Sequence, residues 1–317
     1  MPSIDQHPSA DAVKLLLVGN SGSGKTTALA TLANAGYELF ILDFDNGLDT
    51  LRGFVKPEHH ARVHYKTFID EMVGVQGAMR VPPSAAMKAL QQLDNWVEPA
   101  PAGAAPADPA AAPALVAAAP SPFGPRPAQI SASAAPPAPS GTISLGGPKS
   151  WGPGQVLVID SLTFFGNACM NFALAMNGRT GQRPTQQDWG DAIRLQENLL
   201  TILYADSIRC QVIVTAHLAF QDEAGGTGLQ RAYPSALGSK LPPKVSRYFN
   251  SVLQTESVPG LPGQPPRFRI HTQSTARLDL KSPVPSMPAV LDCDPMAPPP
   301  SGLAKFIELV RGRPLGA

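Results

Sequence analysis

The sequence contains the stretch Gly19-Asn20-Ser21-Gly22-Ser23-Gly24-Lys25-Thr26, followed by Thr27. It has the pattern G-x-x-x-x-G-K-T and lies between an apolar run at residues 13–18 (VKLLLV) and a helix-forming segment at residues 26–35. A strand that passes through a glycine-rich turn into a helix is the context in which this pattern binds phosphates. The stretch therefore predicts a phosphate-binding loop in an α/β fold.

The residue types of this loop predict its ligands. Glycines allow the backbone to wrap around an anion, and the amide N–H groups and the helix dipole face the phosphates. Lys25 is expected to bridge the β- and γ-phosphates, and the Thr26 hydroxyl is expected to hold Mg²⁺. A chance glycine-rich turn is the alternative, and the strand, the lysine and the threonine together argue against it. ATP and Mg²⁺ are the predicted ligands of residues 19–27.

Two further strands are predicted to end in acidic residues. Residues 155–160 (QVLVID) form an apolar run that ends in Asp160, which can hold the metal through water beside the loop. Residues 37–42 (YELFIL) precede Asp45, the candidate base for the water that attacks the γ-phosphate. An acid at a strand end is also common without function, and Asp45 or Asn46 could instead form an Asx turn.

A histidine follows a third apolar run. Residues 211–216 (QVIVTA) precede His217, which is expected at the edge of the sheet where ligands bind and is a candidate sensor of the γ-phosphate. A histidine bonded to a neighbouring loop is the alternative. Early strands and helices alternate, and the later β-type runs at 251–256 and 267–272 are expected as antiparallel additions at the sheet edge. The predicted fold is a three-layer α/β core with a mostly parallel sheet and antiparallel edge strands.

Proline is distributed unevenly along the chain. Of its 35 prolines, many lie with alanines between residues 99 and 140, a composition that buries too little apolar surface to offset the entropy of ordering. We therefore expect a disordered insertion at residues 99–150. It divides one ATPase core into residues 1–98, with the loop and Asp45, and residues 151–295. Residues 296–317 are expected to be a C-terminal tail.

Charge and cysteine content narrow the cellular setting. A net charge of +1 gives no global reason to expect nucleic acid or a membrane, although a local basic groove can exist within a balanced total. The three cysteines are far apart and form no C-x-x-C pair, which fits a reducing compartment. No run approaches the roughly 18 apolar residues of a membrane span, and no signal peptide is evident. We expect a cytoplasmic protein without membrane association.

The loop, Asp45, Asp160 and His217 occur in the order found in the RecA-like ATPase core, and they resemble in particular the small phage-type ATPases that anneal single-stranded DNA. In that family a segment like residues 41–49 (ILDFDNGLD) carries the catalytic acid, and here an aspartate replaces the more usual glutamate. The resemblance implies Mg²⁺-dependent ATP hydrolysis that is slow without DNA. It also implies the host cytoplasm if the chain is phage-encoded. The guanine motif N-K-x-D is absent from the sequence, which argues against a GTPase.

The resemblance also implies partners. Residues 221–233 are glycine-rich where RecA-like proteins carry a mobile DNA-binding loop, so single-stranded DNA is expected there. Arg277 and Lys281 are similar in position to cations that RecA-like subunits offer to a neighbour's ATP, which implies a ring or filament of identical subunits. Cations near the loop can also simply solvate a surface. They are Arg231, Lys240, Lys244 and Arg247.

Three functions remain open at this point. The first is ATP-dependent binding or annealing of single-stranded DNA in recombination. The second is a helicase, remodelling or packaging motor built on the same core, although accessory domains that would couple ATP to movement are not evident. The third is a nucleotide-dependent assembly switch with little hydrolysis.

Overall fold

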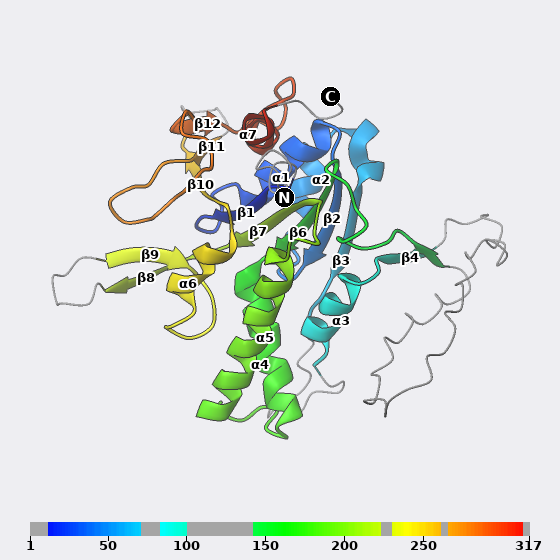
Figure 1. Cartoon of the computed structure of the whole chain (residues 1–317), viewed down its shortest axis with the longest axis vertical. Coiled ribbons are helices and arrows are strands. Elements are labelled where there is room, and N and C mark those ends of the chain that lie inside the picture. The colour runs from blue at the N-terminus through cyan, green and yellow to red at the C-terminus, as the bar shows by residue number, and fades with distance from the viewer. Residues whose placement is uncertain (1–11, 71–82, 100–141, 223–229, 261–265, 313–317) are drawn as a thin grey trace, which may run out of the picture.

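The apolar strands form a sheet that is covered on both faces (Figure 1). The computed structural model describes residues 12–70, 83–99, 142–222, 230–260 and 266–312. In β1 (Lys14–Val18), Leu15 and Leu17 pack into one core, whereas Leu16 and Val18 pack into the other. Strands buried on both faces have continuous apolar sequences, which is why these runs were recognisable. The same division occurs in β2 (Glu38–Asp43), β6 (Gln155–Asp160) and β7 (Gln211–Ala216).

In the described part of the chain this sheet has eight strands in the order β12-β11-β10-β1-β7-β6-β2-β3. The strands from β10 to β3 are parallel, and β11 and β12 are added antiparallel at one edge. The predicted three-layer α/β core with antiparallel edge strands is therefore confirmed. The strands not yet bounded are β3 (Val63–Thr67), β10 (Ser251–Val258), β11 (Arg267–His271) and β12 (Val290–Asp292).

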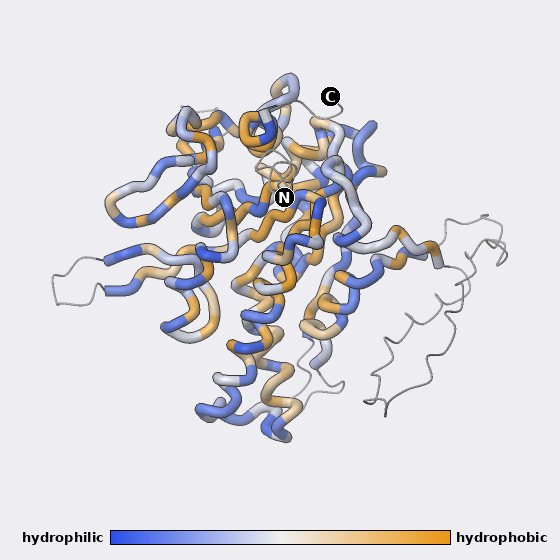
Figure 2. The backbone as a smooth tube through the Cα atoms, viewed as in Figure 1, coloured by the Kyte–Doolittle hydropathy of each residue, from blue (hydrophilic) through white to orange (hydrophobic). Residues whose placement is uncertain are grey.

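Helices cover each face of the sheet. One core contains residues of α1 (Lys25–Asn34), α2 (Asp49–Phe54) and α7 (Gly302–Arg311). The other core contains residues of α3 (Ala85–Gln92), α4 (Leu162–Met176) and α5 (Gln186–Tyr204). The apolar residues gather along the sheet, and the connection between α4 and α5 and the start of α5 are hydrophilic (Figure 2). None of the helices in the described ranges is long and apolar enough to cross a membrane.

Smaller elements lie at the borders of this core. Strands β4 (Val97–Pro99) and β5 (Thr142–Ser144) pair with each other, and β8 (Leu218–Asp222) and β9 (Gln230–Pro234) form a second antiparallel pair, here called the β8–β9 ribbon. The ribbon points away from the sheet (Figure 1). The remaining short helices are η3 (Pro57–Arg62), α6 (Pro242–Val245) and η5 (Ser246–Tyr248).

The structure corrects several expectations about elements. Strand β10 is not an antiparallel addition, because it pairs in parallel with β1, and only β11 and β12 are antiparallel. Helix α4 directly follows β6, and no helix was predicted there. Its apolar residues are not confined to one face, so periodicity does not reveal it. Helix α7 lies within the segment expected to be a tail, and Phe306 and Ile307 are buried against α1.

Part of the chain expected to form a mobile loop is ordered. Residues 221–233 include the ends of both ribbon strands, so the segment begins and ends as a paired hairpin. The glycines Gly225, Gly226 and Gly228 lie outside the described residues, as do residues 100–141 of the expected insertion. Residues 142–150, also assigned to the insertion, include β5 and lead to the buried Trp151.

Candidate functional site

The glycine-rich loop connects β1 to α1 at the edge where the parallel strands end. Gly22 and Gly24 have φ angles of 73° and 92°, which glycine adopts without strain. A Cβ atom at Gly24 would lie 2.4 Å from the ring of Phe268, so this position has no space for a side chain. Ser23 Oγ is 2.7 Å from Thr255 Oγ1 of β10, and the Gly19 amide donates to the Ala216 carbonyl. Neighbouring strands therefore hold the loop from both sides.

Lys25 lies over this loop. It is buried, and its Nζ donates to the carbonyl oxygens of Gly19 and Asn20 at 3.0 and 2.9 Å. Burial lowers its pKa, while the nearby carboxylates Asp160 and Asp45 raise it. The net pKa is lowered, and the two carboxylates partly offset the effect of burial by favouring the ammonium form that binds phosphate oxygens.

The side chains of Thr26 and Asp160 contact each other in the same cleft. Thr26 Oγ1 donates to Asp160 Oδ2 at 3.2 Å, and Thr215 Oγ1 donates to Asp160 Oδ1 at 2.5 Å. Asp160 is 1% exposed, and burial raises its pKa while these two hydrogen bonds lower it. A buried carboxylate next to a hydroxyl fits Mg²⁺, which takes oxygen ligands and typically uses one or two protein carboxylates together with substrate phosphates. These two residues would hold the ion.

Asp45 extends into the same cleft because another aspartate forms the turn. Asp43 Oδ1 accepts hydrogen bonds from the amides of Asp45 and Asn46 at 3.3 and 2.9 Å, and its Oδ2 accepts one from Thr67 Oγ1. Asp43 thus forms an Asx turn with these amides, and the Gly47 backbone lies close enough to the Asp45 carboxylate to lower its pKa by a hydrogen bond. Asn46 has a φ of 56°, and Asp45 Oδ1 is buried without a hydrogen bond of good geometry among the described residues.

The charge state of Asp45 is unusual for an aspartate. Its pKa is raised to about 7, first by burial and then by the negative charges of Asp160 and Asp43. A pKa near the working pH is the value at which a carboxylate exchanges protons most effectively. The position and the pKa of Asp45 both suit a general base.

His217 lines the cleft at the end of β7. Burial lowers the pKa of its imidazole, and the charge of Lys25 lowers it further, so the neutral ring is favoured. The Phe164 ring packs edge-on against it, with 5.8 Å between centroids. A neutral imidazole donates through one nitrogen and accepts through the other, which suits contact with a phosphate and a water.

These residues surround a cavity of about 300 Å³. Sequence reasoning missed Thr50 and Phe54 of α2 and Phe268 of β11, because they carry no motif and only folding brings them to the loop. Among the described residues, neither Arg277 nor Lys281 belongs to the lining of this cavity. Its lining residues are Ser21, Gly22, Gly24, Lys25, Thr26, Thr27, Asp45, Thr50, Phe54, Asp160, His217 and Phe268.

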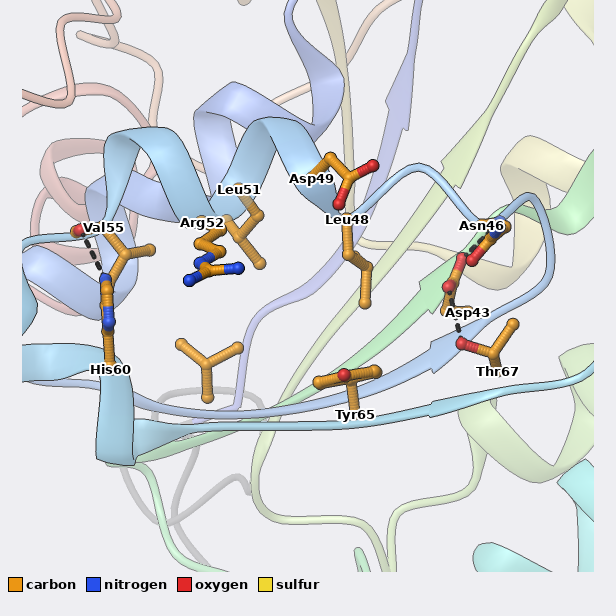
Figure 3. A pocket seen from close by; sticks show the side chains of 11 residues that line it. Asp43, Asn46, Leu48, Asp49, Leu51, Arg52, Val55, His60, Tyr65 and Thr67 are labelled. Carbon is orange, nitrogen blue, oxygen red and sulfur yellow. Dashed lines mark hydrogen bonds between the residues drawn. The ribbon is translucent and has the colours of Figure 1, made fainter.

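A second pocket, of about 270 Å³, lies on the other side of the Asp45 turn, between α2, η3 and β3 (Figure 3). Asp43, Asn46 and Thr67 are at one end, and Arg52 and His60 are toward the other. Asp43 is thus shared, because it faces this pocket and also shapes the turn that carries Asp45.

Of the two predicted trans cations, Arg277 lies beside the β8–β9 ribbon and Lys281 lies beside β10. The Arg277 carbonyl accepts from the Ala232 amide at 2.8 Å, and Arg277 is exposed. Lys281 exchanges backbone hydrogen bonds with Val252 of β10, and partial burial lowers the pKa of its side chain. Among the cations predicted to surround the loop, Arg231 pairs with Asp279 at 3.0 Å. Lys240, Lys244 and Arg247 are exposed.

The fold and the cleft define a class: this is a P-loop nucleotide-binding protein with a three-layer α/β core. Residues 11–281 match the family model described as an AAA domain, which covers most of the chain, and the chain belongs to that family. No curated protein matches the sequence.

Two solved structures resemble parts of this arrangement. One is described as a prototypical ATPase from the type III secretion system of pathogenic bacteria, with 10% identity and a TM-score of 0.37. The likeness covers 78% of this chain and 55% of that one, so the chain spans about half the length of that protein. The other is the RadB recombinase, with 12% identity and a TM-score of 0.37, covering 86% of this chain and 89% of that one.

Proposed function

We propose that this protein hydrolyses ATP in the cleft and uses the reaction to act on single-stranded DNA as an oligomer of identical subunits. The observation that carries the proposal is the convergence of Lys25, Asp45 and the Thr26–Asp160 pair on one cavity. A phosphate-binding loop alone supports nucleotide binding. A carboxylate opposite the loop with a pKa near 7 supports hydrolysis.

The residues divide the reaction between them. The loop amides and Lys25 bind the phosphates, and Lys25 neutralises negative charge on the β- and γ-oxygens. Thr26 and Asp160 would hold Mg²⁺, which when bound supplies positive charge that polarises phosphate oxygens. A water attacks the γ-phosphorus as the bond to the β,γ-bridging oxygen breaks, Asp45 takes the water proton, and ADP leaves with phosphate. His217 contacts the γ-phosphate and senses its loss.

Arg277 and Lys281 support the oligomeric part of the proposal. Both belong to described segments outside the cavity, so within one subunit they do not contact the phosphates. In a ring or filament, an exposed cation from one subunit can approach the next subunit's γ-phosphate and stabilise charge in the transition state. Hydrolysis would then depend on assembly.

The β8–β9 ribbon supports the DNA part of the proposal. It protrudes from the core next to His217, and Phe220 at its surface is 50% exposed. An exposed aromatic ring can stack on a base. Exposed cations can contact phosphates, such as Lys240, shortly after β9 in the sequence, and Arg277, whose carbonyl accepts a hydrogen bond from Ala232 of β9. Proteins that bind single strands without sequence preference combine these two features.

We also propose that residues 1–98 and 151–295 form one ATPase core into which residues 99–150 are inserted. The antiparallel pairing of β4 with β5 supports this division, because it brings the two ends of the inserted segment together. An insertion between adjacent ends adds length without separating the strands of the core.

ATP turnover and DNA binding test the proposal separately. Wild type should hydrolyse ATP with Mg²⁺. Lys25→Ala should lose nucleotide binding, and Asp45→Asn should bind ATP normally but hydrolyse it at least about 100-fold more slowly. Filter binding to a labelled single-stranded oligonucleotide at low salt, with and without ATP, tests the partner. No binding under either condition would remove DNA from the proposal and leave an ATPase.

A second candidate, a nucleotide-dependent assembly switch with little hydrolysis, is favoured by one observation. The acid at the turn is an aspartate, whose side chain is shorter than the glutamate usual in the family it resembles. If particle mass changes with ATP equally in wild type and in Asp45→Asn, assembly follows binding alone. If only wild type cycles between states, hydrolysis is part of the function.

A further inference from the structure

The β8–β9 ribbon starts at the nucleotide cleft. Leu218 of β8 immediately follows His217, and β9 ends one residue before Ser235. The Ser235 amide donates to the His217 carbonyl at 2.7 Å, which closes the base of the ribbon on the residue that lines the cavity. A movement of the His217 backbone therefore moves both ends of the ribbon.

The hydroxyl group of Thr163 in α4 also bonds to both His217 and Ser235 at the base of the ribbon. Thr163 Oγ1 accepts the His217 amide at 3.1 Å and donates to the Ser235 carbonyl at 3.2 Å. A hydroxyl has one hydrogen to donate and lone pairs to accept with, so both bonds form at the same time. Thr163 thereby links the two chain segments at the base of the ribbon.

Thr163 also belongs to the segment that carries the acidic residue of the cleft. It lies in the first turn of α4, which begins just after Asp160 at the end of β6. The next residue, Phe164, packs its ring edge-on against the His217 imidazole. The start of α4 thus contacts both the backbone and the ring of His217.

The other edge of the ribbon reaches the segment with the predicted trans cations. The Ala232 amide donates to the Arg277 carbonyl at 2.8 Å, and Arg231 pairs with Asp279 at 3.0 Å. The ribbon therefore connects His217 at its base to Arg277 along its side.

We propose that Thr163 is a positioning residue that couples the nucleotide cleft to the β8–β9 ribbon. This coupling rests on the proposed function in one respect, namely that His217 responds to nucleotide. When His217 shifts, the two hydrogen bonds of Thr163 reinforce the direct hydrogen bond from Ser235 to His217 and help to carry the shift to β9. Thr163 contacts neither nucleotide nor metal in this role, so its loss leaves nucleotide binding intact and weakens the coupling of the ribbon to the cleft.

Amide hydrogen exchange in the full-length protein tests the coupling without DNA. Exchange in peptides that cover residues 218–222 and 230–235 is measured with and without a slowly hydrolysed ATP analogue and Mg²⁺. In wild type the nucleotide should change exchange in the ribbon. In Thr163→Val, which keeps the side-chain shape but loses both hydrogen bonds, the change should fall by at least about fivefold. Thr163→Ser should restore it.

Matched variants test whether the loss of any helical hydroxyl, or a loss of nucleotide affinity, would give the same change in exchange. Thr201→Val removes another helical hydroxyl, which among the described residues bonds to the Glu197 carbonyl in α5, and should behave as wild type. Thr163→Val should bind the analogue within about threefold of wild type, because it leaves the lining of the cavity unchanged. If Thr163→Val does not fold, Thr163→Ala, which also lacks both bonds, replaces it.

The outcomes separate the coupling from the proposed function. Nucleotide binding to wild type with no change in ribbon exchange overturns the coupling alone, as does an undiminished change in both variants that lack the hydroxyl. Absence of nucleotide binding to wild type overturns both. If single-stranded DNA stimulates hydrolysis by wild type, Thr163→Val should lose that stimulation while keeping its basal rate, and equal stimulation of both would overturn the coupling.

Discussion

Asp45→Asn should make the nucleotide-free protein more stable while it abolishes catalysis. The pKa of Asp45 is raised from 3.8 to about 7 by burial and by the carboxylates of Asp160 and Asp43. A shift of that size corresponds to about 4 kcal/mol of unfavourable free energy in the charged form. Because the side chain is only half-buried, solvent screening reduces this to about 1–2 kcal/mol.

The sign of the pH dependence follows from the direction of the shift. Between about pH 4 and pH 7 the folded protein keeps a proton on Asp45 that the unfolded chain has released, so the stability of wild type falls as pH rises through this window. The neutral asparagine has no such term. The variant should therefore be more stable than wild type at pH 8, and the difference should shrink as pH falls toward about 4.

Thermal unfolding without nucleotide and with a chelator measures the effect. At pH 8 the melting temperature of Asp45→Asn should exceed that of wild type by about 2–6 °C. Asp292→Asn serves as the control, because that carboxylate is 91% exposed and should give no difference. A variant no more stable than wild type at pH 8, or equally stabilised at pH 5, would refute the electrostatic reasoning.

Three further substitutions test the loop, the metal site and the core. Gly24→Ala places a Cβ 2.4 Å from the Phe268 ring at a φ of 92°, so the affinity for a fluorescent ATP analogue should fall about tenfold, and wild-type affinity would contradict the steric argument. Thr215→Val removes a 2.5 Å hydrogen bond to Asp160, and a MgCl₂ titration of hydrolysis should show about a tenfold higher requirement. Trp96→Ala removes a fully buried ring and should lower the free energy of unfolding, measured in urea, by about 3–5 kcal/mol. A much smaller decrease would contradict the packing argument.

Local sequence was sufficient for the phosphate-binding loop. Its chemistry depends on adjacent residues, since the loop amides, Lys25 and Thr26 lie on one continuous turn. Strands β1, β2, β6 and β7 were recognisable for a related reason, because a strand buried on both faces is apolar throughout. In both cases residues that are adjacent in sequence are sufficient for the prediction.

Local sequence was insufficient where apolar periodicity misleads or contacts are distant. Helix α4 has apolar residues on more than one face and was missed, although it places Thr163 and Phe164 beside His217. The direction of β10 was predicted wrongly, because an apolar run has the same composition in a parallel or an antiparallel pair. Phe268 has no motif, and it meets Gly24 only through the pairing of β11 with β10.

The sequence by itself determined that this protein has a P-loop and that Asp45, Asp160 and His217 follow apolar strands. Only the tertiary structure decided that the Asp45 carboxylate lines the cleft with Lys25 and Asp160 and has a raised pKa. The physical reason is that a pKa depends on burial and on charges from other strands, here Asp160 and Asp43, and these are set by strand pairing. The pairing of β1 with β7 and of β7 with β6 brings Thr26 to Asp160 across the cleft.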